Sequence, residues 1–327
     1  MIIGIFKSKY FGQYIGLLLL TFLLQIDAIL NPAMFSEADP GFRFNLFENM
    51  VRQYPLVAAV VSAVLLLIQA FIFNQILENH RLTPLNQLLP AALYILMMSS
   101  NTALLQPNVM IPVNFMMILM LNILFNLYRE PAGFSKMFDA GFLIGLASLL
   151  YLPAAWFLAF IWISLMIYQM FSLRAMLISL TGTIMPHFFL GFYFFWTGRL
   201  KSSLNNLFYN LIDVKILDFH PDVYDFIIWI LFFLLFIYGA SEVLKQITAN
   251  TIEIRRKFRV LAFFFLFSIF TSIFAGSNLQ FHLMLTLLPI TAILSAYLSQ
   301  TKKLFFPELI MSIILIAIFT EKFINLL

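Results

Sequence analysis

The sequence predicts an all-α protein, a polytopic transmembrane helix bundle of about eleven spans. The first observation behind this fold class is composition, because 62% of the 327 residues are apolar and only 10% are charged. A water-soluble surface needs roughly a quarter to a third of charged residues, so this balance excludes a soluble enzyme. The second observation is that the apolar residues gather in runs, and a run of about 20 residues crosses the hydrocarbon layer. Cysteine is absent, which also excludes thiol catalysis and a disulfide-rich secreted module.

The first span is expected from Phe11 to about Leu30, directly after Lys7 and Lys9. A basic start followed by an apolar run is typical of a signal sequence. No small-x-small cleavage site follows, and the run is long enough to cross the membrane. We therefore interpret this segment as a retained signal anchor.

The other spans follow from further apolar runs. The stretch 138–172 is predicted as two short spans, because Pro153 would end or kink a single helix of about 50 Å. We expect spans at 55–77, 84–100, 110–128, 138–152, 154–172, 175–197, 224–241, 259–275, 281–299 and 305–320.

Basic residues predict the orientation. With a cytoplasmic N-terminus, 13 of the 19 lysines and arginines fall in inner loops, and the run from Arg255 to Arg259 contributes most of the excess. This bias follows the positive-inside rule and predicts a multi-pass protein of the bacterial inner membrane. The basic residues therefore indicate the orientation of the protein in the membrane and not a nucleic-acid interface. The expected partner is the lipid bilayer.

Two outer loops are long enough to carry more than a turn. The first outer loop, 31–54, contains FRFNLFENMVRQ, and the fourth, 198–224, contains SSLNNLFYNLIDVKIL. Both stretches are amphipathic, and we expect short helices that lie on the membrane surface. No internal repeat or glycine-rich phosphate loop occurs, so residues 1–327 are predicted to form a single integral membrane domain.

An acidic pair in the first outer loop is the candidate for catalysis. Within FSEADPGFRF, Glu37 and Asp39 are two residues apart and can converge as a base and its partner, or as ligands of a divalent cation. The alternative is a solvated turn that Asp39 initiates before Pro40. The position just after the first span, ahead of a surface helix with Arg43 and Arg52, favours the functional interpretation. No resident metal or cofactor is predicted.

Two ionisable residues fall within spans. Asp27 lies near the end of the first span, and His187 follows Pro186 inside the span 175–197, where the proline frees a backbone carbonyl. Intramembrane ionisable groups are functional by default. The alternative for Asp27 is that it reaches water or caps a helix, and for His187 that it is a satisfied structural histidine. On the inner side, NHRLTPLNQLLP and REPAGFSKMFDAGF are interpreted as connectors with helix caps and ionic ties.

Two resemblances follow from these stretches. NHRLTPLNQLLPAALYIL and SKMFDAGFLIGLASLLYLP resemble a family of uncharacterised inner-membrane proteins of Bacteroidetes. The layout of spans and outer loops is similar to GT-C-like membrane glycosyltransferases that use polyprenyl-phosphate sugars. That second resemblance implies a base at Asp39 or Glu37 and a polyprenyl-phosphate lipid as partner. It also implies lipid-phosphate contacts, which would come from Arg43, Arg52, Arg199 and His282. The acidic site departs from the pattern of these enzymes, because it reads S-E-A-D-P instead of an adjacent acidic pair.

Whether the protein is an enzyme stays open at this point. One alternative is a non-enzymatic subunit of an envelope complex with membrane-protein partners. The other is a transporter or flippase, which needs a polar site near the middle of the membrane, for which His187 is the candidate. A lipid-sized groove below the first outer loop would favour the enzyme. A central cavity around His187 would favour transport, and a solid bundle would favour the subunit.

Overall fold

The structure is a computed structural model that describes residues 2–30, 53–100, 107–128, 133–198, 223–273, 283–301 and 305–326. Within these residues every regular element is a helix, which confirms the predicted all-α class. The α-helices are α1 (Ile2–Phe6), α2 (Phe11–Leu30), α4 (Pro55–Asn79), α5 (Leu89–Met98), α7 (Met110–Leu127), α8 (Phe134–Leu150), α9 (Phe157–Ile167), α10 (Leu173–Trp196), α12 (Val223–Gln246), α13 (Ile252–Ile273), α15 (Met284–Gln300) and α16 (Phe305–Leu326). Two 3-10 helices lie between α-helices of this part of the chain. The first, η1 (Leu152–Trp156), joins α8 to α9, and the second, η2 (Ile247–Ala249), joins α12 to α13.

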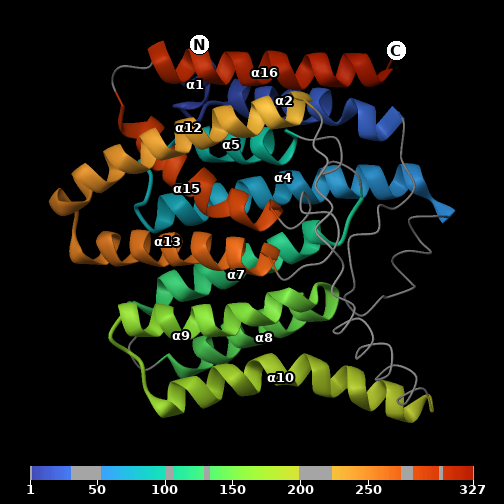
Figure 1. Cartoon of the computed structure of the whole chain (residues 1–327), viewed down its shortest axis with the longest axis vertical. Coiled ribbons are helices and arrows are strands. Elements are labelled where there is room, and N and C mark those ends of the chain that lie inside the picture. Colours follow the sequence, from blue (N-terminus) through green and yellow to red (C-terminus); the bar gives the residue numbers. More distant parts are fainter. Residues whose placement is uncertain are drawn as a thin grey trace.

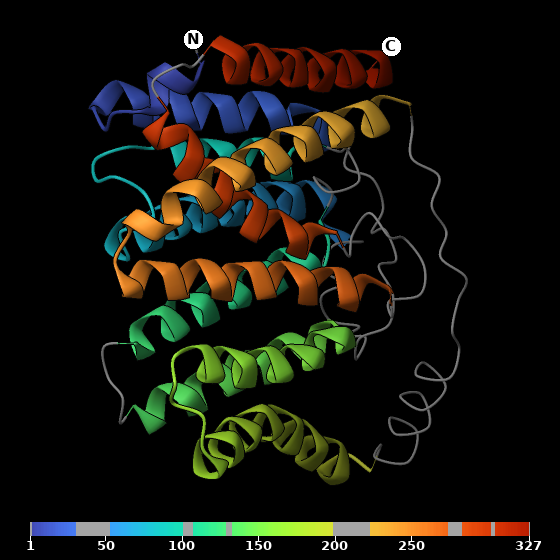
Figure 2. The same cartoon turned by 60° about the vertical axis from the view of Figure 1, so that its left-hand side comes forward.

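The long helices lie side by side with their axes across the longest dimension of the molecule (Figure 1). Short connections gather at one end of the bundle, on the left in Figures 1 and 2. We call this the short-loop end and define it by residues 80–88, 168–172 and 247–251. It is the end that the sequence predicts to be cytoplasmic.

Within the described part of the chain, five helical segments are long and apolar enough to cross a membrane, which indicates a membrane protein. They are Phe11–Leu30, Pro55–Asn79, Met110–Leu127, Leu173–Trp196 and Phe226–Lys245. The predicted count of eleven is not established by helix length. Helix α5 has 10 residues and rises about 15 Å, which is about half of the hydrocarbon thickness.

The predicted break near Pro153 is confirmed. Helix α8 ends at Leu150, and Tyr151 adopts an extended backbone with φ −138° and ψ 98°. Pro153 then occupies the first turn of η1, where its missing N–H costs no hydrogen bond, and α9 follows at Phe157. Two separate helices therefore cover the stretch that composition alone shows as one apolar run.

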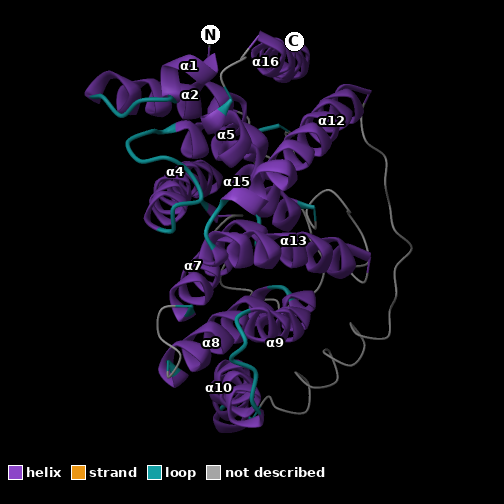
Figure 3. Cartoon of the chain, turned by 90° about the vertical axis from the view of Figure 1, so that its left-hand side faces the viewer, coloured by secondary structure: helices purple, strands orange, loops and turns teal. Residues whose placement is uncertain are grey.

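The core surrounds α5 and α15. All ten residues of α5 are buried, and it contacts α4 and α15, near the middle of the upper bundle in Figure 3. A short helix that is apolar on every side belongs inside a protein. Helix α10 is the opposite case, because it lies at the edge of the bundle and exposes Phe189 and Phe192. It packs mainly on α8.

Glycines bring α8 and α10 unusually close. A Cβ atom placed on Gly141 would lie 2.1 Å from the Ser179 carbonyl oxygen, and one on Gly182 would lie 2.3 Å from the Phe138 carbonyl oxygen. Such backbone-to-backbone approach is how small residues drive helix association in membranes, where lipid is as apolar as leucine.

Candidate functional site

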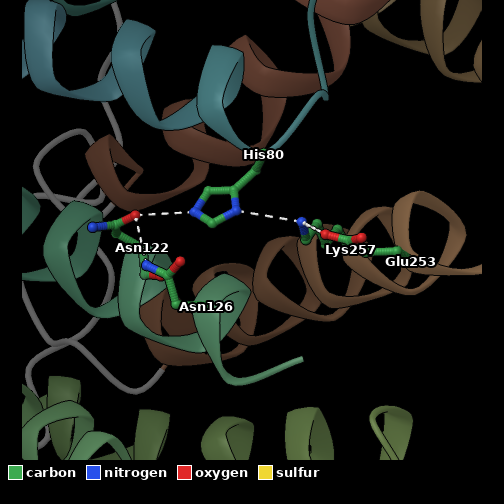
Figure 4. Close-up of polar contacts among 5 residues, drawn as sticks. All are labelled: His80, Asn122, Asn126, Glu253 and Lys257. Carbon is green, nitrogen blue, oxygen red and sulfur yellow. Dashed lines mark hydrogen bonds and ion pairs between the residues drawn. The ribbon is translucent and has the colours of Figure 1, made fainter. Parts of the chain in front are cut away.

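Five polar side chains meet at the short-loop end, and we call them the His80 network. His80 caps the C-terminus of α4, Asn122 and Asn126 lie on α7, and Glu253 and Lys257 lie in the first turns of α13 (Figure 4). The Lys257 side chain is 0% exposed, whereas that of Glu253 is 28% exposed. The network therefore runs from the edge of the bundle into its interior.

Hydrogen-bond chemistry fixes the proton positions in the His80 network. The Lys257 ammonium lies 2.5 Å from Glu253 Oε1 and 3.3 Å from His80 Nδ1. An ammonium group only donates, so Nδ1 is the acceptor and the imidazole proton is on Nε2. That N–H donates to Asn122 Oδ1 at 3.0 Å. The imidazole is thus neutral, and the charge of Lys257 is balanced by Glu253. The ring also packs edge-on against Phe125, with centroids 5.2 Å apart.

A second group of polar contacts holds the connector 80–88. Glu78 accepts from Lys9 Nζ and from the Gln87 backbone amide, both at 3.1 Å. Asn74 Nδ2 donates to the Gln87 carbonyl at 3.1 Å, and Gln87 Nε2 donates to Ser299 Oγ at 2.9 Å. These contacts join α4, α15, the connector 80–88 and the segment between α1 and α2 at the same end, and they include one ion pair, between Lys9 and Glu78.

The N-terminal segment is packed into the short-loop end as well. Ile3 and Phe6 are buried, and the Phe6 carbonyl accepts from the Leu88 amide at 2.9 Å. Lys7 Nζ donates to the Thr301 carbonyl at 3.0 Å. Burial lowers the pKa of Lys7, and the nearby Glu308 carboxylate opposes that shift.

The structure places the two intramembrane candidates in different surroundings. Asp27 is buried near the end of α2. His187 bridges α8 and α10, because its Nδ1 lies 3.1 Å from the Thr183 carbonyl and its Nε2 lies 3.2 Å from Ser148 Oγ. Both ring nitrogens thus have partners, which is typical of a structural histidine and gives no support to a transport site.

An apolar groove of about 360 Å³ lies between α5, α12, α13 and α15. Its walls are aromatic and aliphatic, with Phe226 and Trp229 from α12 and Phe265 and Ile269 from α13. Two hydroxyl groups line it, and both donate to carbonyls of their own turn. These are Ser100 to Met97 at 2.8 Å and Thr286 to Leu283 at 2.6 Å. The groove therefore offers almost no free hydrogen-bonding group and suits a hydrocarbon chain.

The groove lies away from the short-loop end. The first turns of α12 and α15 and the last turns of α5 and α13 form its walls. These are the ends of the helices that join residues 101–106, 199–222 and 274–282. In the predicted orientation this is the outer end. Among the described residues, no group of three histidine or acidic side chains is placed to hold a metal ion.

A family model described as a family of unknown function, DUF6427, matches residues 42–327, which is most of the chain. The chain belongs to DUF6427. The predicted membership of an uncharacterised family is thereby confirmed, and the description of DUF6427 assigns no activity. No curated protein and no solved structure matches the chain.

The sequence-predicted residues of the outer loops lie outside the described residues. They are Glu37, Asp39, Arg43, Arg52, Arg199 and His282. The four basic residues fall within the part of the chain that DUF6427 covers, whereas Glu37 and Asp39 precede it. Their catalytic and phosphate-binding roles stay predictions. The sequence did not predict the His80 network, although it marked His80 and Lys257 as inner-side residues.

Proposed function

We propose that this DUF6427 protein is an inner-membrane glycosyltransferase that uses a polyprenyl-phosphate sugar as donor on the outer face. The observation that carries the proposal is the apolar groove at the predicted outer end of the bundle. Its volume of about 360 Å³ lies within the range of ligand-binding clefts. Its mainly apolar lining fits a hydrocarbon chain better than a free sugar.

The carrier lipid would place its chain in the groove and its phosphate at the membrane surface. The predicted surface helix of the first outer loop carries Arg43 and Arg52, and Arg199 and His282 lie in other outer loops. Cationic side chains there would hold the phosphate, because charge-assisted bonds to phosphate are strong. Each of these loops joins the bundle at the groove end.

In the proposed reaction, the carboxylate of Asp39 or Glu37 removes the proton of an acceptor hydroxyl. The acceptor oxygen forms a bond to the anomeric carbon, and the bond from that carbon to the phosphate oxygen breaks. The polyprenyl phosphate leaves with the electron pair, and the basic groups stabilise its added charge. The proton ends on the carboxyl group.

The first test is mass spectrometry of lipids that copurify with the gently extracted protein. Ile230→Trp would fill the groove, and Ile237→Trp is its control on the same helix face, two turns away and outside the groove. We expect polyprenyl phosphate with the native protein and the Ile237 variant, and little with the Ile230 variant. Only bulk phospholipid in every sample would favour the alternative of a non-enzymatic subunit.

The second test concerns the base. Asp39→Asn and Glu37→Gln, made separately, remove a proton acceptor while they keep the size of the side chain. We expect at least one of them to abolish sugar transfer in membrane vesicles without loss of folded protein. Full activity of both variants would place the base elsewhere or exclude glycosyl transfer.

A further inference from the structure

We propose that His80 and Lys257 form a proton-binding site that holds α4 to α13 at the short-loop end. On acidification the contact between the two side chains breaks, and a movement of α13 then changes the packing of the groove. This inference does not depend on glycosyl transfer. It starts from the His80 network, in which one imidazole joins α4, α7 and α13 (Figure 4).

The contacts of His80 with Lys257 and Asn122, which we call the tie, depend on a neutral imidazole. Lys257 donates to His80 Nδ1, and His80 Nε2 donates to Asn122 Oδ1, so each ring nitrogen has one role. Protonation of His80 would place an N–H on Nδ1, where it would face the Lys257 ammonium at 3.3 Å. Two donors and two positive charges would then oppose each other, and the contact between α4 and α13 would break.

Several charged and polar groups among the described residues lie near His80. From α13 it faces Lys257, and Glu253 lies beyond that lysine and already balances it. From α7 it meets Asn122 and Phe125, neither of which titrates. On its own segment, Glu78 is engaged by Lys9, and Arg81 is exposed. Among these residues, the positive charge of Lys257 is paired with the negative charge of Glu253, and a protonated His80 would place a second positive charge beside Lys257.

The sign of the pH dependence follows. An imidazole in water titrates near about pH 6.5, so a released His80 takes up a proton readily below that value. A tied His80 cannot do so without losing its bond to Lys257. Acid therefore favours the open form, and the tie should be intact above about pH 7 and lost toward about pH 5.

Helix α13 connects this tie with the groove. Lys257 lies near its N-terminus, and Phe265 and Ile269, further along the same helix, line the groove. A helix of 22 residues moves as a stiff rod, so release of one end changes its packing at the other. Acidification should therefore alter the surroundings of Ile269.

The experiment uses the lack of native cysteine. Ile269→Cys is labelled with an environment-sensitive dye in the full-length protein, and Phe189→Cys on the exposed face of α10 is the matched control. Emission is followed from pH 8 to pH 5, well below the unfolding temperature. We expect a shift with a single midpoint between about pH 5 and 7 at position 269, and none at position 189.

Variants of the tie decide the outcome. His80→Asn keeps amide hydrogen bonds but does not titrate, so the shift at position 269 should vanish, whereas His187→Asn should leave it unchanged. If His80→Asn does not fold, Lys257→Met combined with Glu253→Gln removes the opposing charge and should also abolish the shift. No shift in the native background, or an equal shift after these substitutions, would overturn the proposal. Neither result depends on sugar transfer, so the proposed function is tested separately.

Discussion

Replacing Gly141 or Gly182 by alanine should force α8 and α10 apart. In the native bundle the backbones of the two helices meet at these glycines, where a Cβ atom would lie 2.1 Å and 2.3 Å, respectively, from a carbonyl oxygen of the other helix. A carbon atom normally approaches a carbonyl oxygen to about 3.3 Å, so each substitution requires a separation of about 1 Å. The contact cannot relax through a flexible side chain, because the opposing atoms are backbone.

The expected loss of stability follows from the cost of overpacking, which is about 1–3 kcal/mol. A change of 1 kcal/mol moves the melting temperature of a protein of a few hundred residues by about 2–4 °C. Both variants should therefore melt several degrees below the native protein. The double variant should fall by less than the sum, because the gap opened by one methyl group admits the other.

The assay is thermal unfolding of the purified protein in mild detergent. Gly191→Ala is the matched control, because Gly191 lies on α10 and a Cβ atom there would meet nothing within 4 Å. Alanine favours a helix over glycine by about 1 kcal/mol, so this control should melt at or above the native temperature. If the variants at 141 and 182 melt like the control, α8 and α10 do not pack as closely as the structure shows.

Two further predictions concern buried polar groups. Tyr168→Phe should be neutral or stabilising, because the Tyr168 hydroxyl is buried without a partner. Tyr94→Phe should cost about 1–2 kcal/mol, because Gln69 Oε1 loses the hydroxyl that donates to it. Thermal unfolding of the two variants side by side tests this contrast, and equal melting temperatures would contradict it. Glu78→Gln should weaken the short-loop end, since Lys9 loses its counter-charge and a backbone amide keeps only a neutral acceptor. Limited proteolysis within residues 80–88 should then become faster, and an unchanged rate would show that other contacts hold this connector.

The sequence predicted the helices well because apolar runs and proline act locally. The break at Pro153 is an example, since the proline fixes its own φ and lacks an N–H wherever the chain goes. The span predicted at 84–100 shows the limit of the same signal. Its helix is only Leu89–Met98, because Glu78, Asn74 and Ser299 hold the preceding residues in a connector. Hydropathy does not distinguish a helix buried in protein from one that crosses lipid.

The candidate sites depend on long-range contacts, which composition does not reveal. His80 and Lys257 are 177 residues apart, and each alone looks like an ordinary inner-side basic residue. The groove is harder still to predict, because Phe226 in its wall and Phe188 on the exposed face of α10 belong to the same residue type. Only the packing of four helices distinguishes them. By contrast, the partner that His187 needs could be predicted in kind, and the Thr183 carbonyl and Ser148 provide it.

The two ends of the bundle differ in a way that bears on both proposals. Ion pairs hold the short-loop end, where Lys9 meets Glu78 and Lys257 meets Glu253. At the groove end, the described residues of α5, α12, α13 and α15 that line the groove are mainly apolar, and apolar contacts are not directional and permit helices to shift. A bundle tied at one end and apolar at the other opens most easily at the apolar end. That is where a hydrocarbon chain would enter sideways from the bilayer, and where the first outer loop, which carries Glu37 and Asp39, joins the helices. Loss of the ion pair between Lys257 and Glu253 should therefore change the lipid occupancy of the groove, which mass spectrometry of the copurified lipids would measure.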